Sequence, residues 1–401
     1  MVQHKKLPDY PTDFYFVVKM QIHTKMEYTA NYNELRNLFT TERDYIPIPG
    51  RGVCIRNISF TSHFPDHNFI NASDTLIAEN RCFTYPVFSP TGKKSDKVIL
   101  LLHGLNERSW HKYLVWALSL AENTGSHVIL FPISFHINRS PDSWRDPRKM
   151  VSIMNSRRMT TENIMMSSFA NAALSTRLSE YPFRFFNSGY QTAADIISLV
   201  KSIRDGLHPV VPKGSYVNIF AYSIGAFLAE ILLMGNPDDL FSDSQLFIFC
   251  GGSVFSSMRG SSKLIMDSLA FDMVYSYYMN DFEKSLKGTG PVIDFLKNSS
   301  LGMAFRSMID FGRFRNFREN ILNRLRDQIH SVTLKNDAVI PADGVLATLN
   351  TTNKQPAEVW DFSHSYSHEN PFPVFTSALS EEVNRSFERV FSRASSFFSC
   401  C

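Results

Sequence analysis

The chain of 401 residues has few cysteines and almost no net charge. The five cysteines are scattered and odd in number, without metal-ligand spacing, which favours a reducing compartment over a disulfide framework. They are Cys54, Cys82, Cys250, Cys400 and Cys401. The 41 Lys and Arg residues against 38 Asp and Glu residues give a formal net charge of +3, too small to indicate a nucleic acid partner.

The sequence also lacks a segment typical of membrane targeting. Residues 1–9 contain no apolar core of a secretory signal, so we expect a cytoplasmic protein. The longest apolar stretch, residues 217–234, carries Asn218, Ser223 and Glu230, and a strand, a turn and a helix explain it better than a membrane span. There is no internal repeat or low-complexity tract. What is present, 44% hydrophobic and 13% aromatic residues, is typical of a globular protein with a large core.

From residue 97 onward, short apolar runs alternate with helical segments. The runs lie at residues 97–102, 127–134, 216–220, 245–251, 331–334 and 358–362. This alternation predicts an α/β fold with a mostly parallel, doubly wound sheet that binds ligands at the carboxyl ends of its strands. Earlier apolar runs, such as residues 14–18 and 82–88, predict an antiparallel edge.

We expect one domain over residues 1–401. Residues 1–96 would supply the edge strands, and residues 97–136, 187–252 and 329–401 the core. Residues 137–186 are predicted to be a lid insertion and residues 253–328 a mostly helical cap insertion. Both would emerge above the ends of strands, where they would select the substrate.

The most specific motif is Ala221-Tyr222-Ser223-Ile224-Gly225, between an apolar strand and an apolar helix. A serine with small residues two positions away on either side is typical of a nucleophile elbow, whose sharp turn lifts the hydroxyl out of the sheet. The turn also aims the free N–H groups and the positive end of the helix at the group under attack. The plainer alternative is a tight junction with a capping serine.

Upstream, His103 and Gly104 follow the buried run at residues 97–102 directly. Acyl transfer needs two N–H donors for the developing oxyanion, and we assign them to the backbone of Leu105 and Ile224. A simple turn from strand to helix at residues 103–104 stays the alternative. The residues expected to shape the two loops are His103, Gly104, Tyr222 and Gly225.

Downstream, Asp337 follows the run at residues 331–334, with Pro341 four residues later to stop the strand, and is the predicted triad acid. The loop after the last strand supplies His364 and His368. We favour His368 as the base, because six residues past the strand it can fold back over the strand tips. The two histidines also have the spacing of a helical zinc pair, but the nearby Pro371 disfavours a helix, so we expect no metal.

The chain resembles the α/β-hydrolase superfamily in four features that follow one another in the expected order. They are the His-Gly pair at the end of a strand, the elbow, the loop from Asp337 to Pro341, and a histidine loop before the final helix. Residues 102–136 also resemble a little-characterised bacterial family of this superfamily, which implies no particular activity. The chain departs from the superfamily pattern in having Ala221 in place of the first elbow glycine and in having two histidines in the loop.

The sequence therefore predicts a serine hydrolase that acts on a carboxylic ester, thioester or amide through Ser223, Asp337 and His368, without a cofactor. Acyl transfer to an alcohol and a non-catalytic binding protein on the same scaffold stay open. Residues 139–158 and 305–326 each carry six basic residues against two acidic ones. Such a basic lid could receive an anionic acyl substrate or touch a membrane, although a solvated helix face explains it more simply. No oligomeric state is indicated.

Overall fold

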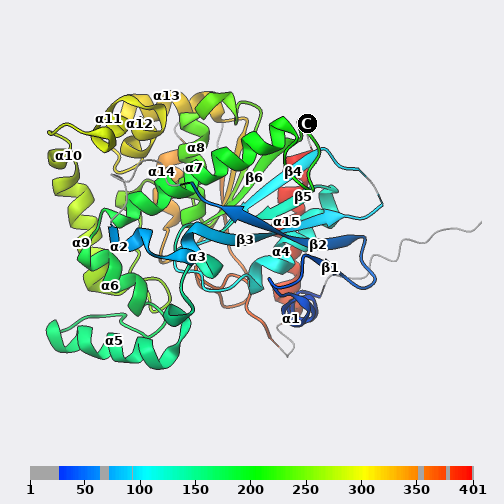
Figure 1. Cartoon of the computed structure of the whole chain (residues 1–401), viewed down its shortest axis with the longest axis horizontal. Coiled ribbons are helices and arrows are strands. Elements are labelled where there is room, and N and C mark those ends of the chain that lie inside the picture. Colours follow the sequence, from blue (N-terminus) through cyan, green and yellow to red (C-terminus); the bar gives the residue numbers. More distant parts are fainter. Residues whose placement is uncertain (1–26, 64–71, 93, 351–355, 376–379, 400–401) are drawn as a thin grey trace, which may run out of the picture.

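The computed structural model describes residues 27–63, 72–92, 94–350, 356–375 and 380–399. At its centre lies a nine-stranded sheet in the order β1-β2-β3-β5-β4-β6-β7-β8-β9 (Figure 1). The strands are β1 (Tyr45–Pro47), β2 (Val53–Thr61), β3 (Cys82–Pro90), β4 (Lys97–Leu102), β5 (His127–Leu130), β6 (Tyr216–Tyr222), β7 (Leu246–Phe249), β8 (Ile329–Leu334) and β9 (Ala357–Trp360).

The sheet is antiparallel at one edge and parallel elsewhere. The pairs β1–β2, β2–β3 and β3–β5 are antiparallel. The neighbouring pairs in the rest of the sheet, β5–β4, β4–β6, β6–β7, β7–β8 and β8–β9, are parallel. The order from β2 to β9 is that of the α/β-hydrolase fold, with β1 as a short additional edge strand. The predicted fold class, including its antiparallel N-terminal edge, is confirmed.

The central strands are apolar throughout because both of their faces are covered. Val98, Leu100 and Leu102 of β4 point into one hydrophobic cluster, whereas Ile99 and Leu101 point into the other. Such two-sided burial is the reason that these strands read as continuous apolar runs and not as alternating ones.

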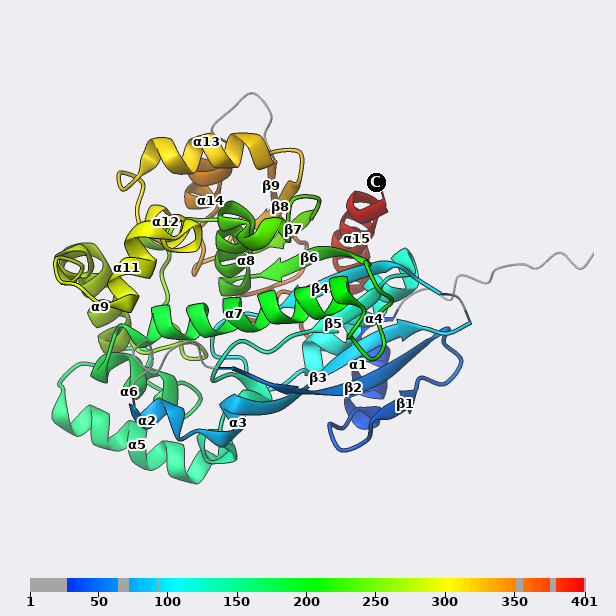
Figure 2. The ribbon, with the colours of Figure 1, turned by 45° about the horizontal axis from the view of Figure 1, so that its top comes forward.

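Helices cover both faces (Figures 1 and 2). One face packs against α1 (Tyr28–Leu38), α4 (His111–Thr124) and α15 (Ser380–Ser399). The other face packs against α7 (Arg184–Asp205), α8 (Ile224–Gly235) and α14 (Ala342–Leu349). Gly125 and Gly206 end α4 and α7 in the left-handed conformation, as glycine commonly does after a helix.

The two stretches expected to be insertions contain most of the remaining helices. Residues 137–186 hold η1 (Ile137–Arg139), η2 (Asp142–Arg145), α5 (Pro147–Thr160) and α6 (Ala172–Glu180). Residues 253–328 hold η4 (Phe255–Ser257), α9 (Ser268–Ser276), η5 (Tyr277–Asp281), α10 (Phe282–Ser285), α11 (Pro291–Asn298), α12 (Ser300–Ser307) and α13 (Arg315–Leu325). Helix α6 packs against α9, so the two stretches meet on one side of the molecule, at the left of Figures 1 and 2.

Several boundaries differ from those expected. Helix α7 begins at Arg184 and not near residue 187, and the Arg184 guanidinium in its first turn pairs with Asp74 and Glu180. The N-terminal part also contains α1, which the sequence did not predict, and the short elements α2 (Ala72–Thr75) and α3 (Ala78–Arg81). A further short helix, η3 (Pro237–Asp239), follows α8.

Some expectations fall on other parts of the chain. The predicted strand at residues 14–18, the N-terminal residues 1–9, and Cys400 and Cys401 lie outside the described residues. Within the described ranges, Cys54, Cys82 and Cys250 are free thiols. No helix in those ranges has the length and apolar character needed to cross a membrane.

Candidate active site

Ser223 stands between β6 and α8 in a strained conformation. Its backbone has φ 58° and ψ −125°, a region that residues with a side chain rarely adopt. Its carbonyl oxygen accepts a hydrogen bond from Ala226 at 3.0 Å, which closes the turn at once. The strand therefore turns into the helix within one residue, the geometry expected of a nucleophile elbow.

Glycines make room for this turn. A Cβ atom on Gly225 would lie 2.7 Å from the carbonyl oxygen of Leu102, so only glycine lets α8 approach the end of β4 this closely. A Cβ atom on Gly104 would lie 3.0 Å from the Tyr222 ring and 3.4 Å from Ser223 Cβ. The loop after β4 and the elbow are therefore pressed together, and this contact brings Leu105 next to Ser223.

A relay of two short hydrogen bonds runs from Ser223 through His368 to Asp337. Ser223 Oγ lies 2.7 Å from His368 Nε2, and His368 Nδ1 lies 2.7 Å from Asp337 Oδ2. Because a carboxylate only accepts, Nδ1 carries the ring proton and Nε2 is left to accept the hydroxyl proton of Ser223. All three side chains are buried.

The Asp337 carboxylate is fixed by the backbone that follows it. Its Oδ1 accepts hydrogen bonds from the N–H groups of Val339 at 2.9 Å and Ile340 at 2.8 Å, in the loop between β8 and α14. These bonds leave Oδ2 for the imidazole. The acid thus has one oxygen for its own loop and one for His368, which holds the ring in one orientation.

The alternative residues lie elsewhere. His364 Nε2 donates to the carbonyl of Pro371 at 3.0 Å, and its ring stacks on Phe362 beneath α15, away from Ser223. Asp361, the other carboxylate near the last strand, accepts from Tyr366 at 2.8 Å on the surface. The zinc-like spacing of His364 and His368 brings no shared site, since His368 uses both ring nitrogens in the relay.

Two side chains hold the His368 loop in place. The Tyr222 hydroxyl donates to the carbonyl oxygen of His368, and the two rings stack at 5.5 Å. Lys112, in the first turn of α4, donates to the carbonyl oxygen of Glu369 at 2.9 Å and lies over the Tyr222 ring. Burial holds the pKa of Tyr222 well above its usual range, so its hydroxyl keeps its proton and acts as a donor.

The two positions assigned to the oxyanion donors lie on the wall of the cavity that Ser223 lines. The Ile224 N–H opens α8, where the first N–H groups have no partner within the helix. The Leu105 N–H shares a peptide plane with the Gly104 carbonyl, which His103 Nδ1 binds at 2.8 Å. In a trans peptide the two groups point in opposite directions, so His103 turns the Leu105 N–H away from itself.

His103 is placed for this structural task alone. Its Nε2 accepts a hydrogen bond from the Ile133 N–H at 2.9 Å, so both ring nitrogens are occupied. Burial, together with the nearby His136 and cationic side chains, holds its pKa well below the usual range. The neutral ring supports the loop after β4 and has no free nitrogen with which to act as a base.

The sequence did not point to Tyr113 and Glu107. The Gly104 N–H donates to the Tyr113 hydroxyl at 3.0 Å, and this hydroxyl donates to Glu107 at 2.7 Å. Glu107 in turn pairs with Lys112 at 2.5 Å. These contacts join the loop after β4 to the His368 loop. A lysine and a tyrosine just before the apolar stretch of α4 were the local signal.

Two apolar cavities meet at the elbow. The serine cavity, of about 40 Å³, is lined by Leu105, Phe185, Ser223, Ile224, Phe255, Met258, Gly260, Ile265, Met266, Phe271, Val274, Val339 and Ile340. The larger of these two, the main cavity, has a volume of about 90 Å³, extends between α6, α7, α8 and α12, and shares Leu105, Phe185 and Ile224 with the serine cavity. Side chains from both predicted insertions contribute to these walls.

Most of the basic groups in the two insertions have partners within the chain. Arg139 pairs with Asp195, and Arg157 pairs with Asp267. In the second insertion, Arg318 is buried, and its partners in the described part of the chain are backbone carbonyls, among them that of Phe311 at 2.8 Å. These guanidinium groups hold the insertions together, and none of the three lines the serine cavity or the main cavity.

The sheet order defines the class of protein: the chain has the α/β-hydrolase fold. Residues 63–399 match the sequence model of a family of unknown function (DUF6051), so the chain belongs to this family. No curated protein matches the chain in sequence.

Solved structures with a related arrangement include carboxyl esterase 2 of the fungus Tuber melanosporum. It is 10% identical, with 92% of this chain and 97% of that chain covered and a TM-score of 0.46. The peroxisomal α/β-hydrolase of Saccharomyces cerevisiae is 12% identical, with 86% and 90% covered and a TM-score of 0.42. A cold-adapted esterase from an Arctic intertidal metagenomic library is 11% identical, with 88% and 99% covered and a TM-score of 0.39.

Proposed function

We propose that the protein is a serine hydrolase that cleaves carboxylic esters of apolar acyl groups. The observation that carries the proposal is the unbroken relay from Ser223 through His368 to Asp337, with both hydrogen bonds at 2.7 Å. A nucleophile, a base and an orienting acid within hydrogen-bond distance form the arrangement that activates a hydroxyl.

In the proposed reaction, Ser223 Oγ attacks the ester carbonyl carbon and its proton passes to His368 Nε2. The negative charge that develops on the carbonyl oxygen is stabilised by the N–H groups of Leu105 and Ile224 and by the positive end of α8. The bond to the leaving alcohol then breaks, and the alcohol takes the proton from His368. Asp337 stays ionised and keeps the imidazolium in place.

In the second half, a water molecule attacks the acyl-enzyme. Its proton goes to His368, the bond to Ser223 Oγ breaks, and the serine recovers its proton as the carboxylic acid leaves. Because the serine cavity is lined almost entirely by apolar side chains, it favours an uncharged acyl group over the anionic one that the basic residues in the insertions suggested. An alcohol in place of water would make the protein an acyltransferase.

The proposal is tested by labelling with a fluorophosphonate probe. We expect the parent protein to take up one equivalent, with the modified peptide containing Ser223, and Ser223→Ala to take up none. Ser253→Ala is a matched control, because Ser253 is buried near the same strand ends but donates only to the carbonyl of Val254 at 3.1 Å. This variant should be labelled like the parent.

Labelling that persists in Ser223→Ala, or its absence from the parent, would contradict the proposal. Hydrolysis and transfer are separated by analysing the products of a para-nitrophenyl ester with and without a short alcohol. A carboxylic acid supports hydrolysis, whereas a new ester formed at the expense of the acid supports the acyltransferase.

A further inference from the structure

The loop that follows β5, residues 131–139, is strained around His136. Phe135 has φ 67° and Ile137 has φ 49°, so the residues on both sides of His136 adopt a conformation that side chains disfavour. No glycine relieves this strain. Two neighbouring residues of this kind persist only where the surrounding structure holds them in place.

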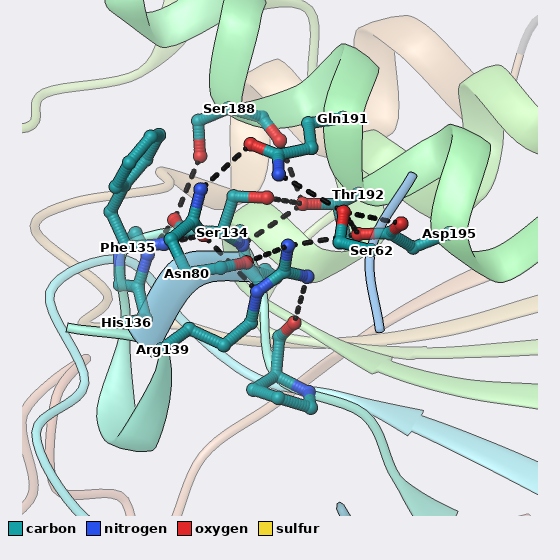
Figure 3. A network of polar contacts seen from close by, with 12 residues as sticks. Ser62, Asn80, Ser134, Phe135, His136, Arg139, Ser188, Gln191, Thr192 and Asp195 are labelled. Atoms are coloured by element: carbon teal, nitrogen blue, oxygen red, sulfur yellow. Dashed lines mark hydrogen bonds and ion pairs between the residues drawn. The ribbon is translucent and has the colours of Figure 1, made fainter. Parts of the chain in front are cut away.

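Buried and half-buried side chains hold the backbone of this loop (Figure 3). Asn80 Oδ1 accepts from the Phe135 N–H at 3.1 Å, and Thr192 Oγ1 accepts from the Ser134 N–H at 3.0 Å. The hydroxyl of Ser188 donates to the Ser134 carbonyl at 3.0 Å. Side chains from α3 and α7 therefore fix the residues just before His136.

A buried ion pair anchors the other end of the loop (Figure 3). Arg139 donates to Asp195 at 2.8 Å and to the carbonyl of Pro132 at 3.1 Å, and its Nε donates to Asn80 Oδ1 at 3.2 Å. Ser62 donates to the same carboxylate at 2.7 Å. The Arg139 guanidinium thus closes the loop on itself and ties it to α7.

The result of this bracing is a fixed imidazole with one unused nitrogen. His136 is 5% exposed, and its Nδ1 donates to the Ser134 carbonyl at 2.9 Å. Burial lowers the pKa of His136 to about 4, so the ring is neutral near pH 7 and Nε2 carries a lone pair. This Nε2 atom is buried and has no hydrogen-bond partner among the described residues.

His136 lies in the wall between two cavities. The main cavity and a smaller side cavity of about 30 Å³ share Phe135, His136, Leu174 and Arg177. Among the described residues that line either cavity, His136 Nε2 is the only buried side-chain nitrogen or oxygen left without a partner. Leaving a buried acceptor unpaired is costly, which favours a partner supplied by a bound molecule.

We propose that His136 determines specificity, by accepting at Nε2 a hydrogen bond from a hydroxyl group on the acyl chain of the substrate. This inference rests on the proposed function, since it requires that the acyl chain extends from the serine cavity into the main cavity, which shares Leu105 and Ile224 with it. The preferred substrates are then esters of hydroxylated acyl groups.

The charges around the cavity fit a neutral donor better than an anion. Arg177 and Arg184 line the main cavity, but the Asp74 carboxylate binds both of them at 2.9 Å. A lone pair on Nε2 repels a carboxylate or phosphate oxygen and attracts an O–H group. The rest of the wall is mainly aliphatic and aromatic and accommodates the hydrocarbon part of the chain.

Binding to the Ser223→Ala protein tests the inference without hydrolysis. Calorimetric titration would compare methyl octanoate with its positional monohydroxy derivatives. We expect one position of the hydroxyl to bind about ten-fold more tightly than methyl octanoate, the effect of one good hydrogen bond to a buried acceptor. The same preference should appear in kcat/KM for the parent protein.

Two substitutions of His136 separate its nitrogens. Asn at this position can still donate to the Ser134 carbonyl, but its side chain is too short to place an acceptor where Nε2 lies. His136→Asn should therefore reduce the ratio of the two affinities, hydroxylated ester over methyl octanoate, to about one. The longer Gln side chain can place its amide oxygen there, so His136→Gln should keep part of the ten-fold ratio. His208→Asn is the matched control: this buried histidine also has a pKa lowered to about 4, but its Nε2 already contacts the Tyr85 hydroxyl at 2.9 Å.

The inference is overturned if no hydroxylated ester binds better than methyl octanoate, as when a water molecule is the only partner of Nε2, or if His136→Asn keeps the preference. It is also overturned if neither kind of ester binds. Failure of the proposed function looks different, because the hydroxyl preference then persists in binding while Ser223 takes up no fluorophosphonate.

Discussion

The elbow after β6 and the loop after β5 are both strained, but for different reasons. Ser223 is held at φ 58° by its immediate neighbours, since Gly225 lets the following helix approach the backbone of β4. Phe135 and Ile137 have no such neighbours: Asn80 of α3 accepts from the Phe135 N–H group, and the carbonyl oxygen of Glu107 accepts from the Ile137 N–H group. The first kind of strain can be read from five consecutive residues, whereas the second depends on contacts between segments far apart in the sequence.

The strongest test of the first region is Ser223→Gly. Hydrolysis should fall by roughly 10⁴ to 10⁶, as for triad serines generally. Glycine adopts a positive φ without strain, so this variant should be about 1 kcal/mol more stable than Ser223→Ala, which is equally inactive. Chemical unfolding of both variants measures the difference. Equal stabilities would show that the elbow stores no strain.

A smaller loss is expected at the acid. Asp337→Asn should lower kcat by about 10³ to 10⁴ with much less change in KM, because the amide supports the wrong tautomer of His368. Asp361→Asn is the control, since its carboxylate contacts Tyr366 on the surface and not the imidazole. Steady-state kinetics on a para-nitrophenyl ester decides between them. A larger loss at Asp361 would contradict the assignment.

In the loop after β5, we expect substitutions to change the stability of the protein. Arg139→Met leaves the buried Asp195 without its cation, which should lower the free energy of unfolding by about 3 to 5 kcal/mol. Replacing Asp195 by Leu as well should recover part of the loss. Arg145→Met removes a pair with the exposed Asp142 and should cost less than about 1 kcal/mol. Equal losses in urea unfolding would mean that the network does not brace the loop.

The helix that follows the elbow supplies an effect that is spread over several pH units. Glu230 in α8 is buried with neither carboxylate oxygen partnered among the described residues, and burial raises its pKa to about 8. Between the unfolded pKa, near 4.3, and this value the native state holds a proton that the unfolded state loses. The free energy of unfolding should therefore fall as pH rises through this window, by at most about 1.4 kcal/mol per pH unit.

Glu230→Gln should flatten this pH dependence, because an amide has no proton to lose. Glu388→Gln, a change on the exposed side of α15, should leave it as in the parent. Thermal unfolding at several pH values makes the comparison. An unchanged slope in Glu230→Gln would show that the carboxyl finds a partner in solution.

The same contrast explains how much the sequence could predict. The sequence could predict the parallel sheet and the three residues Ser223, Asp337 and His368. Apolar runs, small residues beside a serine, and polar residues just after strands are local patterns. The structure brings these three side chains into contact, and their catalytic role stays a prediction. Helix α1 and the start of α7 were not foreseen; both contact distant segments, through the Tyr28 N–H to Asn384 and through Arg184 to Asp74.

The roles of Tyr113 and His136 could not be predicted for a related reason. Tyr113 looks like one more aromatic residue of an apolar helix until the Gly104 N–H is seen to donate to its hydroxyl. His136 owes its position to side chains more than fifty residues away, such as those of Asn80 and Thr192. Neither contact produces a sequence pattern at a fixed spacing, so neither could be predicted from the sequence.

The most direct test of the central claim is capture of the acyl-enzyme. The parent protein would be mixed with excess para-nitrophenyl octanoate, quenched in acid within milliseconds and digested for mass spectrometry. The account predicts a burst of about one equivalent of para-nitrophenol and an octanoyl group on the peptide that contains Ser223. An acyl group on another residue would contradict the account. Turnover of para-nitrophenyl esters with neither an acylated peptide nor a burst would contradict it as well.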